Sequence, residues 1–240
     1  MYGYGFRNIY RSILSGGGAI NPLWNGLQAY YTADNTPNDA LGNYNGTLVN
    51  GATYGTGIIN QGFSLDGVND YVDFGDVLDN DGTQPQSVSF WVKLNSTSNQ
   101  LLVGKQNNAV PYNGWGVVMV SSKIYYAFFN NVPSIMAQTE NTQVLTTGVW
   151  YHVVVTYDGS KNASGIKVYI DGSLGTQNII TDTLGSNSSS ASGIKATISS
   201  RNGSSLMSNS TIDEVALFND ELTQTEVTEL YNSGLGKQYS

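Results

Sequence analysis

An all-β protein, built as an antiparallel β-sandwich, is the fold class that this sequence predicts. Glycine, tyrosine, serine, threonine and asparagine are abundant in the 240 residues, and charged residues make up only 12%. That composition favours short strands joined by tight turns over helix bundles. Several runs alternate apolar and polar residues, which is the period of a sheet with one buried face. Asp-Gly pairs at 66–67 and 171–172 supply the positive φ that tight connections need.

The charge and the cysteine content exclude some classes of protein. The formal net charge is -8, and the few lysines and arginines are scattered, so we expect no nucleic-acid partner. The chain has no cysteine, so the fold holds without disulfides. The length suits one large β domain with a short appendage. We therefore predict an N-terminal tail over residues 1–20 and a single domain over residues 21–240.

The first fifteen residues differ from the rest because they are aromatic and basic and end at three consecutive glycines, 16–18. Their apolar residues have helical spacing, which predicts a short amphipathic helix with one apolar face. These residues are Phe6, Ile9, Tyr10, Ile13 and Leu14. An isolated helix of this length is marginal in water. The tail is thus either unstructured alone or ordered against the domain or a partner, and its composition favours a docking peptide.

Residues 1–20 contain no signal-peptide core and no stretch long enough to span a membrane. If Met1 is the natural start, the protein is made in a cytoplasm without a secretion signal. Combined with the docking peptide, this predicts a virion or an extracellular surface as its location, and no insertion into a membrane.

The strands are expected in the following order. An opening strand at 25–31 leads into a turn-rich loop at 34–43. Residues 62–74 form two strands, 63–65 and 71–74, bent back on each other around 66–70. Further alternating runs occupy 88–94, 101–105, 115–120, 123–129, 150–157, 166–170 and 212–218. The run at 115–120 should pair with 123–129 through Ser121 and Ser122, and 150–157 should form a hairpin with 166–170.

A single helix is indicated near the C-terminus. Thr223 and Glu226 have the spacing of a capping box, and Leu222 and Val227 that of a hydrophobic staple. Gly234 is placed to stop the helix. We predict a short helix with a structural role.

Several of these segments resemble the motifs of one family. GFSLDGVNDYVDF at 62–74 is similar to its "sFDGvnDYV" signature, GVWYHVVVTYDG at 148–159 to "g.WhHvavtyDg", and IDEVALF at 212–218 to "IDEVriy". The chain thus resembles the laminin-G-like, concanavalin A-like jelly rolls over about residues 25–232. The resemblance implies a jelly-roll sandwich and a carbohydrate-binding role as the frequent function of such domains.

A calcium ion is expected at the opening loop. Calcium takes six to eight oxygen ligands, and Asp34, Asn35 and Asp39 supply such oxygens in one loop. The resemblance implies a structural calcium between this loop and the C-terminal strand that carries Asp213. The alternative is that Asp34 and Asp39 make Asx turns and that Asp213 accepts hydrogen bonds from buried backbone amides.

Catalysis is not expected. Glycoside hydrolysis needs two carboxyl groups about 5–5.5 Å or about 6.5–9.5 Å apart, and the "ExDxxE"-like spacing of hydrolases with this architecture is missing from the sequence. Asp213 and Glu214 are adjacent in a strand, so their side chains should point to opposite faces. The single histidine, His152, lies in a strand and is expected to be structural.

The ligand-binding residues are predicted from the aromatic and amide content of the central part of the chain. They are Tyr112, Trp115, Tyr126, Asn130 and Arg201. The alternative is that Trp115 and about half of the tyrosines belong to the core, because alternation buries every second residue.

Two functions remain open. The first is a non-catalytic carbohydrate- or surface-recognition module that binds a cell-surface glycan and is displayed on a particle through its N-terminal peptide. The second is a structural or decoration protein of a phage virion, in capsid or tail, with no glycan ligand of its own. In either case a particle or virion protein docks the tail, and a homo-oligomer is the default for such displayed modules.

Overall fold

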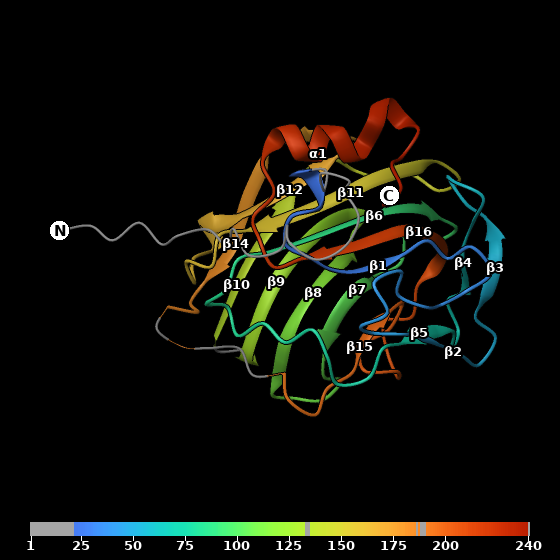
Figure 1. Cartoon of the computed structure of the whole chain (residues 1–240). Helices are drawn as coiled ribbons and strands as arrows, with labels where there is room; N and C mark the ends of the chain where they lie inside the picture. Colours follow the sequence, from blue (N-terminus) through green and yellow to red (C-terminus); the bar gives the residue numbers. More distant parts are fainter. Residues whose placement is uncertain (1–21, 133–134, 186, 188–190, 240) are drawn as a thin grey trace, which may run out of the picture.

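Two antiparallel β-sheets packed face to face make up the computed structural model, which describes residues 22–132, 135–185, 187 and 191–239 (Figure 1). Sheet A has the strand order β13-β12-β11-β6-β16-β4-β3, with β1 also paired to β16. Sheet B has the order β14-β10-β9-β8-β7-β15-β5-β2. The predicted fold class, an antiparallel sandwich with a short C-terminal helix, is confirmed.

The strands of sheet A are β1 (Leu27–Tyr31), β3 (Thr53–Thr56), β4 (Gln61–Asp66), β6 (Gln86–Leu94), β11 (Trp150–Tyr157), β12 (Ile166–Ile170), β13 (Ser173–Leu174) and β16 (Asn209–Phe218). Those of sheet B are β2 (Thr47–Val49), β5 (Tyr71–Asp73), β7 (Gln100–Gln106), β8 (Tyr112–Val120), β9 (Lys123–Val132), β10 (Ile135–Asn141), β14 (Gln177–Asp182) and β15 (Ala196–Ile198). The described helices are η1 (Pro22–Trp24), η2 (Ala163–Gly165), α1 (Gln224–Tyr231) and η3 (Asn232–Gly234).

The main core lies between the two sheets. Phe90 and Val92 of β6 face it from sheet A, and Trp115, Tyr126 and Phe128 face it from sheet B. Alternate residues of these strands thus face this core, as the alternation predicts, and most of the residues between them are buried on the outer faces of the sheets. Full burial of each such side chain contributes about 1.5–3 kcal/mol.

Two predicted hairpins are confirmed. Strands β8 and β9 pair from Val120 and Lys123 outward, and Ser121 and Ser122 between them have φ values of 50° and 64°. Positive φ at both central residues is the geometry of a tight two-residue hairpin turn. Strands β11 and β12 also pair antiparallel.

The predicted hairpin within residues 62–74 is wrong. Strand β4 pairs with β3 and β16 in sheet A, whereas β5 pairs with β2 and β15 in sheet B. The intervening loop crosses from one sheet to the other. Asp70 holds this crossing, because its buried carboxylate accepts the backbone N–H groups of Asp66, at 3.2 Å, and Gly51, at 2.7 Å. Asp66-Gly67 is therefore a corner between the sheets.

Helix α1 begins as predicted. Both bonds of the capping box are present, from Glu226 N–H to the Thr223 side chain and from Thr223 N–H to the Glu226 carboxylate. The helix ends earlier than expected, since Asn232 adopts the left-handed conformation, with φ 48°, and takes the role expected of Gly234. At eight residues, α1 is too short to span a membrane, and the other described helices are shorter still.

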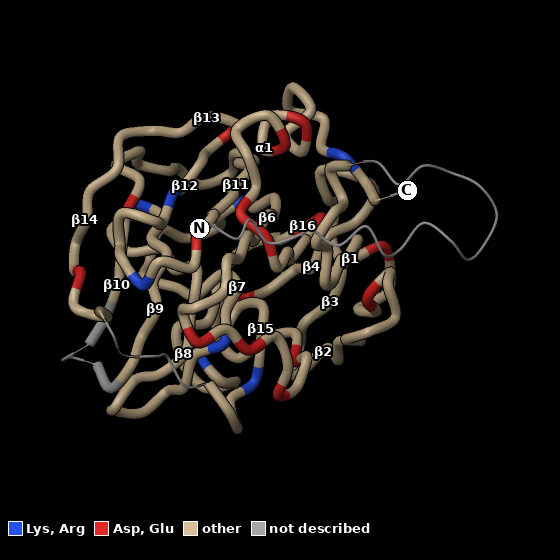
Figure 2. Tube along the Cα trace, turned by 60° about the vertical axis from the view of Figure 1, so that its left-hand side comes forward, with Lys and Arg blue, Asp and Glu red and all other residues tan. Residues whose placement is uncertain are grey.

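A second, smaller apolar cluster lies on the outer face of sheet A. Val227 and Leu230 of α1 and Leu23 and Trp24 of η1 pack there on strand residues that include Phe218. The helix thus covers the side of sheet A that faces away from the main core (Figure 1). Acidic and basic residues are interleaved along the described chain, including around β7 and β15 (Figure 2). The tail predicted over residues 1–20, with Phe6, Ile9, Tyr10, Ile13 and Leu14, lies outside the described residues.

Candidate functional site

A row of small residues crosses the outer face of sheet B. Gly104 of β7 lies opposite Gly116 of β8, and Gly116 lies opposite Ala127 of β9. These residues face away from the core because Gly116 alternates with the buried Trp115, and Ala127 with Tyr126 and Phe128. We call Gly104, Gly116 and Ala127 the small-residue row. All three residues are buried between larger neighbours, Ala127 completely, and Leu101 Cδ1 lies 3.3 Å from the position that a Cβ of Gly104 or Gly116 would take.

A polar cluster lies next to this row, formed by Gln106, Tyr112 and Arg201, which we call the Arg201 cluster. The Arg201 Nε–H group donates to Gln106 Oε1 at 3.0 Å, and the guanidinium carbon lies 4.6 Å from the centre of the Tyr112 ring. Arg201 comes from the loop after β15, where its backbone bridges to Ser205. Two of the five residues predicted to bind a ligand, Tyr112 and Arg201, are thus brought together.

Gln106 belongs to this site and was missed in the sequence. It is only 1% exposed, and its Nε2 group has no hydrogen-bond partner in the described part of the chain. Gln106 sits two residues after Gly104, so it faces the same side of β7. The sequence offered one signal for Gln106, since a polar residue stands at an outer-face position of a strand. Its partner could not be found in this way, because Arg201 is 95 residues away in sequence.

A second polar group borders the small-residue row on its other side. Glu140 of β10 accepts hydrogen bonds from Asn178 Nδ2 at 2.8 Å and from Lys123 Nζ at 3.3 Å. Burial alone would raise the pKa of Glu140, but hydrogen bonds from Tyr125, Asn178 and Lys123 outweigh it and lower this pKa. Burial raises the pKa of Tyr125 to about 12, and Glu140 adds to the shift. Glu140 is therefore an ionised acceptor, held by its neighbours.

The other predicted ligand-binding residues lie elsewhere. Trp115 and Tyr126 are fully buried, and their polar atoms are used inside the core: Trp115 Nε1 donates to the Leu78 carbonyl at 3.0 Å, and Tyr126 Oη donates to Gln86 Oε1 at 2.6 Å. Trp115 and Tyr126 thus belong to the core, which was the alternative stated for them, and their rings have no surface left for a ligand. Asn130 lies half-buried near the end of β9.

The opening loop is organised by Asp39. Its buried carboxylate accepts four backbone N–H bonds, from Tyr30, Leu41, Asn43 and Tyr44, at 2.9–3.2 Å. This is the turn chemistry named as the alternative to a calcium ligand. Asn35 is exposed in the same loop. Asp34 accepts from the Gln61 backbone at 3.0 Å and from the Asn60 side chain at 3.1 Å.

Asp213 lies close enough to Asp34 for the two charges to interact. One Asp213 oxygen accepts the Ile58 and Ile59 N–H groups at 2.9 and 3.1 Å, and the other accepts the Glu214 N–H at 2.8 Å. Burial raises the pKa of Asp213 to about 7, the backbone bonds oppose this, and Asp34 adds to it.

Glu214 does not follow simple strand alternation. Its φ is 51°, and the β16–β6 register shifts between Asp213 and Ala216, so a bulge brings Glu214 to the same neighbourhood. Gln238 links it to Asp34, since its Nε2 donates to Glu214 Oε1 at 2.8 Å and lies 3.5 Å from Asp34 Oδ2. The prediction that Asp213 and Glu214 point to opposite faces is therefore wrong, because it assumed an unbroken strand.

Glu214 is also the residue of this region with an unmet oxygen. Burial raises its pKa to about 8, and Oε2 is buried without a hydrogen-bond partner. An unpartnered carboxylate oxygen beside Asp34 and Asp213 suits a cation. Within the described chain, however, no three histidine, cysteine, aspartate or glutamate residues are arranged to hold a metal ion. Calcium therefore stays a prediction.

His152 is buried on the outer face of sheet A. Its Nε2 lies 3.0 Å from Ser89 Oγ, and its ring lies against Trp91, with centroids 5.0 Å apart. Burial lowers the pKa of His152 to about 3, so the ring is neutral at physiological pH. The histidine has the packing and hydrogen-bonding surroundings predicted for a structural residue.

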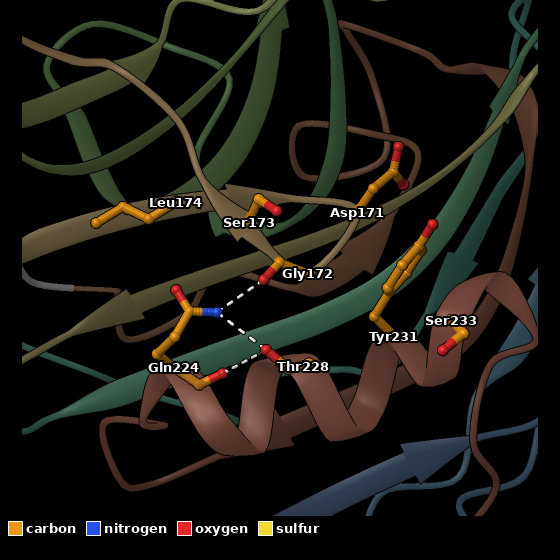
Figure 3. A pocket seen from close by; sticks show the side chains of 8 residues that line it. All are labelled: Asp171, Gly172, Ser173, Leu174, Gln224, Thr228, Tyr231 and Ser233. Atoms are coloured by element: carbon orange, nitrogen blue, oxygen red, sulfur yellow. Dashed lines mark hydrogen bonds between the residues drawn. The ribbon is translucent and has the colours of Figure 1, made fainter.

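An open pocket of 470 Å³ lies on sheet A, between the β12–β13 turn and α1 (Figure 3). Gln224 reaches across it from the helix, donating to the Gly172 carbonyl at 2.7 Å and to Thr228 Oγ1 at 3.1 Å. Asp171 accepts the His152 N–H at 2.9 Å. These hydrogen bonds fix α1 and the β12–β13 turn to sheet A. The pocket therefore lies where structural contacts join the helix to the sheet.

Solved structures of other proteins share this fold. Domain 4 of AbnA, an extracellular arabinanase from Geobacillus stearothermophilus, is 20% identical, with a TM-score of 0.67 over 88% of this chain and 98% of that domain. The receptor-binding domain of botulinum neurotoxin D is 17% identical, with a TM-score of 0.62 over 88% of this chain and 54% of that one. A mutant of Trypanosoma rangeli sialidase is 16% identical, with a TM-score of 0.63 over 92% of this chain and 35% of that one.

At these identities the likeness establishes the fold alone. No curated protein sequence matches the chain. A laminin-G family model described as the concanavalin A-like lectin/glucanases superfamily matches residues 66–228, which is more than half of the 240 residues. The matched region runs from the corner between the sheets to α1. The chain therefore belongs to the concanavalin A-like lectin/glucanase superfamily.

Proposed function

We propose that this chain is a non-catalytic carbohydrate-recognition module, whose ligand binds on the outer face of sheet B beside the Arg201 cluster. The observation that carries the proposal is the cluster itself. It combines an aromatic ring, a guanidinium and an amide with an unmet donor, next to a row of residues without bulk. Apolar surface with a few well-placed polar groups is the usual composition of small-molecule sites.

The likeness to the arabinanase domain supports this proposal. That domain, matched here over 98% of its length, was solved in complex with arabinotriose. The same fold at the same size therefore accommodates a short saccharide in another protein.

The state of Glu140 favours binding over hydrolysis. A glycosidase uses one carboxyl group with a raised pKa as the general acid, and a second carboxylate as base or nucleophile. Glu140, beside the small-residue row, has a lowered pKa and its Oε1 accepts from two nitrogen donors. It is suited to accept a hydrogen bond from a ligand hydroxyl and not to protonate a leaving group.

A glycan array probed with the full chain, with calcium and with a chelator, tests the proposal. We expect binding to a defined glycan set, weakened by Tyr112→Ala. Trp150→Ala is the matched control, because Lys93 lies 5.1 Å from the Trp150 ring in the equivalent cation–aromatic pair on sheet A. Absence of glycan binding, or equal binding by Tyr112→Ala, would contradict the proposal.

We also propose a structural calcium at Asp34, Asn35 and Asp213, joined by Glu214. Asp39, the fourth predicted ligand, is left out of this site because four backbone amides take its acceptor sites. The unmet Oε2 of Glu214 and the proximity of Asp34 to Asp213 support it. Calcium would draw on oxygen lone pairs that backbone amides leave over, since an ionised carboxylate has about four acceptor sites.

Display of the module on a virion or another extracellular surface, through the tail at residues 1–15, is proposed from the sequence alone. Deletion of residues 1–15 should abolish attachment to the particle while glycan binding persists. If attachment is lost and the full chain binds no glycan, the alternative of a structural or decoration protein of a phage virion is favoured.

A further inference from the structure

We propose that the saccharide bound at the Arg201 cluster is acidic, and that its negatively charged group, a carboxylate or a sulfate ester, is held by Arg201 and Gln106. This inference rests on the proposed function and adds the chemical class of the ligand. Gln106 Nε2 has no hydrogen-bond partner and Arg201 has no carboxylate partner among the described residues, and both are hydrogen-bond donors, so the missing partner is an acceptor.

Arg201 belongs to the minority of described cations for which no ion pair with a carboxylate is found, together with Lys93, whose Nζ lies over the Trp150 ring. Five lysines of the described part pair with carboxylates: Lys105, Lys123, Lys167, Lys195 and Lys237. Arg201 has no carboxylate within 4.0 Å among the described residues, although the chain has 18 acidic residues against 10 basic ones. Among the described residues, the Arg201 guanidinium is thus a cation without a counter-ion.

Arg201 is held in place without being neutralised. Its Nε–H is used by Gln106 Oε1 at 3.0 Å, and one face of the guanidinium lies against Tyr112. The terminal amino groups form the remaining edge of the planar fork, which matches the paired oxygens of a carboxylate or sulfate. Burial lowers the pKa of Arg201, and Tyr112 acts in the opposite direction. A bound anion would offset this cost of partial burial.

Gln106 supplies the second, independent observation. The hydrogen bond from Arg201 fixes which end of the amide faces the guanidinium, because only Oε1 can accept it. Nε2 is therefore a donor, and it is buried without a partner in a residue that is 1% exposed. Buried polar groups in folded proteins are nearly always paired, and of the six unmet buried atoms in the described residues this donor is the one that lies beside a cation without a carboxylate partner, where an anionic ligand would pair both.

Glu140 and the Arg201 cluster lie on the two sides of the small-residue row. Gly104, Gly116 and Ala127 lie opposite one another across three strands, with Gln106 and Phe129 along one side of the row and Val118 and Tyr125 along the other. A saccharide bound across this face, over the side chains that flank the row, would place its anionic group at Arg201 and its hydroxyl groups toward the acceptor Glu140. This arrangement predicts a saccharide with one charged end.

The experiment is a glycan array containing the neutral, carboxylated and sulfated forms of the same saccharides, followed by titration of 3′-sialyllactose against lactose. We expect the acidic forms to bind about tenfold more tightly than the neutral parent, because hydrogen bonds to charged groups are the stronger kind. The preference should weaken at high salt. The carboxylated and sulfated arms identify which anion is preferred.

Three variants locate the preference. Arg201→Met should abolish it, whereas Lys93→Met, which removes one positive charge from sheet A, should leave it intact. Gln106→Glu places a carboxylate inside the protein at Arg201, so it should abolish the preference while raising the unfolding midpoint. A higher unfolding midpoint in Gln106→Glu would show that Arg201 lacks a negative partner in the parent protein. This result does not require Arg201→Met to fold.

The outcomes distinguish this inference from the proposed function. If neutral parents bind as tightly as acidic forms, or if the preference survives Arg201→Met or Gln106→Glu, the acidic ligand is wrong and carbohydrate recognition stands. If no glycan of any class binds, the proposed function fails, and this inference with it.

Discussion

The outer faces of the two sheets are built in opposite ways. On sheet A, bulky apolar residues such as Phe218, Tyr30 and Val154 lie under α1 and η1 and form a second core. On sheet B, the corresponding face has Gly104, Gly116 and Ala127 in neighbouring strands. Figure 1 shows the helix on the first of these faces.

This difference separates stability from recognition. A face of large apolar side chains must be covered, because its burial contributes to folding. On sheet B the small central residues are buried among larger neighbours such as Leu101, and no described helix packs over them as α1 packs on sheet A, so the polar border of this face can be used for a ligand. Unmet buried polar atoms occur on both sheets, as His152 Nδ1 and Gln106 Nε2 show, so the division rests on the size of the side chains.

The largest effect is expected from truncation on the covered face. Phe218 is fully buried and stacks on Trp24 with ring centroids 6.3 Å apart. Phe218→Ala should lower the free energy of unfolding by about 3–5 kcal/mol, measured by chemical denaturation. Tyr125→Ala, at a half-buried position on the outer face of sheet B, should cost about 1 kcal/mol. Equal costs would remove the distinction between the faces.

The local parts of this architecture could be predicted from the sequence. Alternation located the strands, and the Thr223–Glu226 spacing located α1, because strand period and capping depend on residues close together in the chain. The pairing of residues 63–65 with 71–74 was wrong for a related reason. A two-strand motif with a tight corner looks the same whether its strands share a sheet or lie in opposite sheets.

The site could be predicted only in part. Tyr112 and Arg201 were named, but composition alone cannot separate Tyr112 from the buried Tyr126, since that depends on the phase of each strand. Gln106 and Glu214 were missed because their roles depend on partners 95 and 24 residues away, Arg201 and Gln238. The bulge that turns Glu214 has no clear local signal.

Calcium would tie the covered face to the opening loop. Gln238, in the segment that follows α1, bonds Glu214 and approaches Asp34. Calcium at a hundredfold excess over its dissociation constant should stabilise the fold by about 2.7 kcal/mol, seen as a rise in the unfolding midpoint over the chelator sample. The rise should be lost in the double variant Asp34→Ala, Asp213→Ala.

The double variant could fail to fold, because Asp213 accepts three backbone hydrogen bonds. The single variant Asp34→Asn keeps these bonds and should also lose the calcium response. Asp66→Asn, in the corner between the sheets, is the control and should keep the calcium response. If calcium shifts none of these proteins, the carboxylates serve the backbone amides only.

The pH dependence of stability tests whether water is excluded from the covered face, because His152 is buried there. The pKa of His152 is about 3 in the folded chain, against an ordinary value of about 6.5 in the unfolded chain. The unfolded state therefore takes up a proton first as the pH falls. The stability that this residue contributes is present above about pH 6.5 and is lost toward pH 3, by about 1.4 kcal/mol per pH unit.

His152→Gln should show a shallower loss of unfolding free energy than the parent between those pH values, with a constant difference above pH 7. Carboxylates titrate in both proteins, so the difference between the two curves isolates the histidine. Parallel curves over the whole range would mean that water reaches His152 and that the face is not closed.

The smallest effect on stability is expected at the small-residue row, where a substitution should nevertheless weaken glycan binding. A Cβ at Gly116 would meet Leu101 Cδ1 at 3.3 Å, the end of a flexible side chain. Gly116→Ala should therefore change the free energy of unfolding by less than about 1 kcal/mol, since alanine suits a strand better than glycine. It should still weaken glycan binding by roughly fivefold, or about 1 kcal/mol, because the methyl group displaces Leu101 within the face on which the ligand lies. Gly55→Ala, in β3 of sheet A with its nearest contact at 3.5 Å, is the matched control for both measurements. If Gly116→Ala binds glycan as well as the parent does, the ligand does not depend on the packing of this face, and the small residues there have a reason other than recognition.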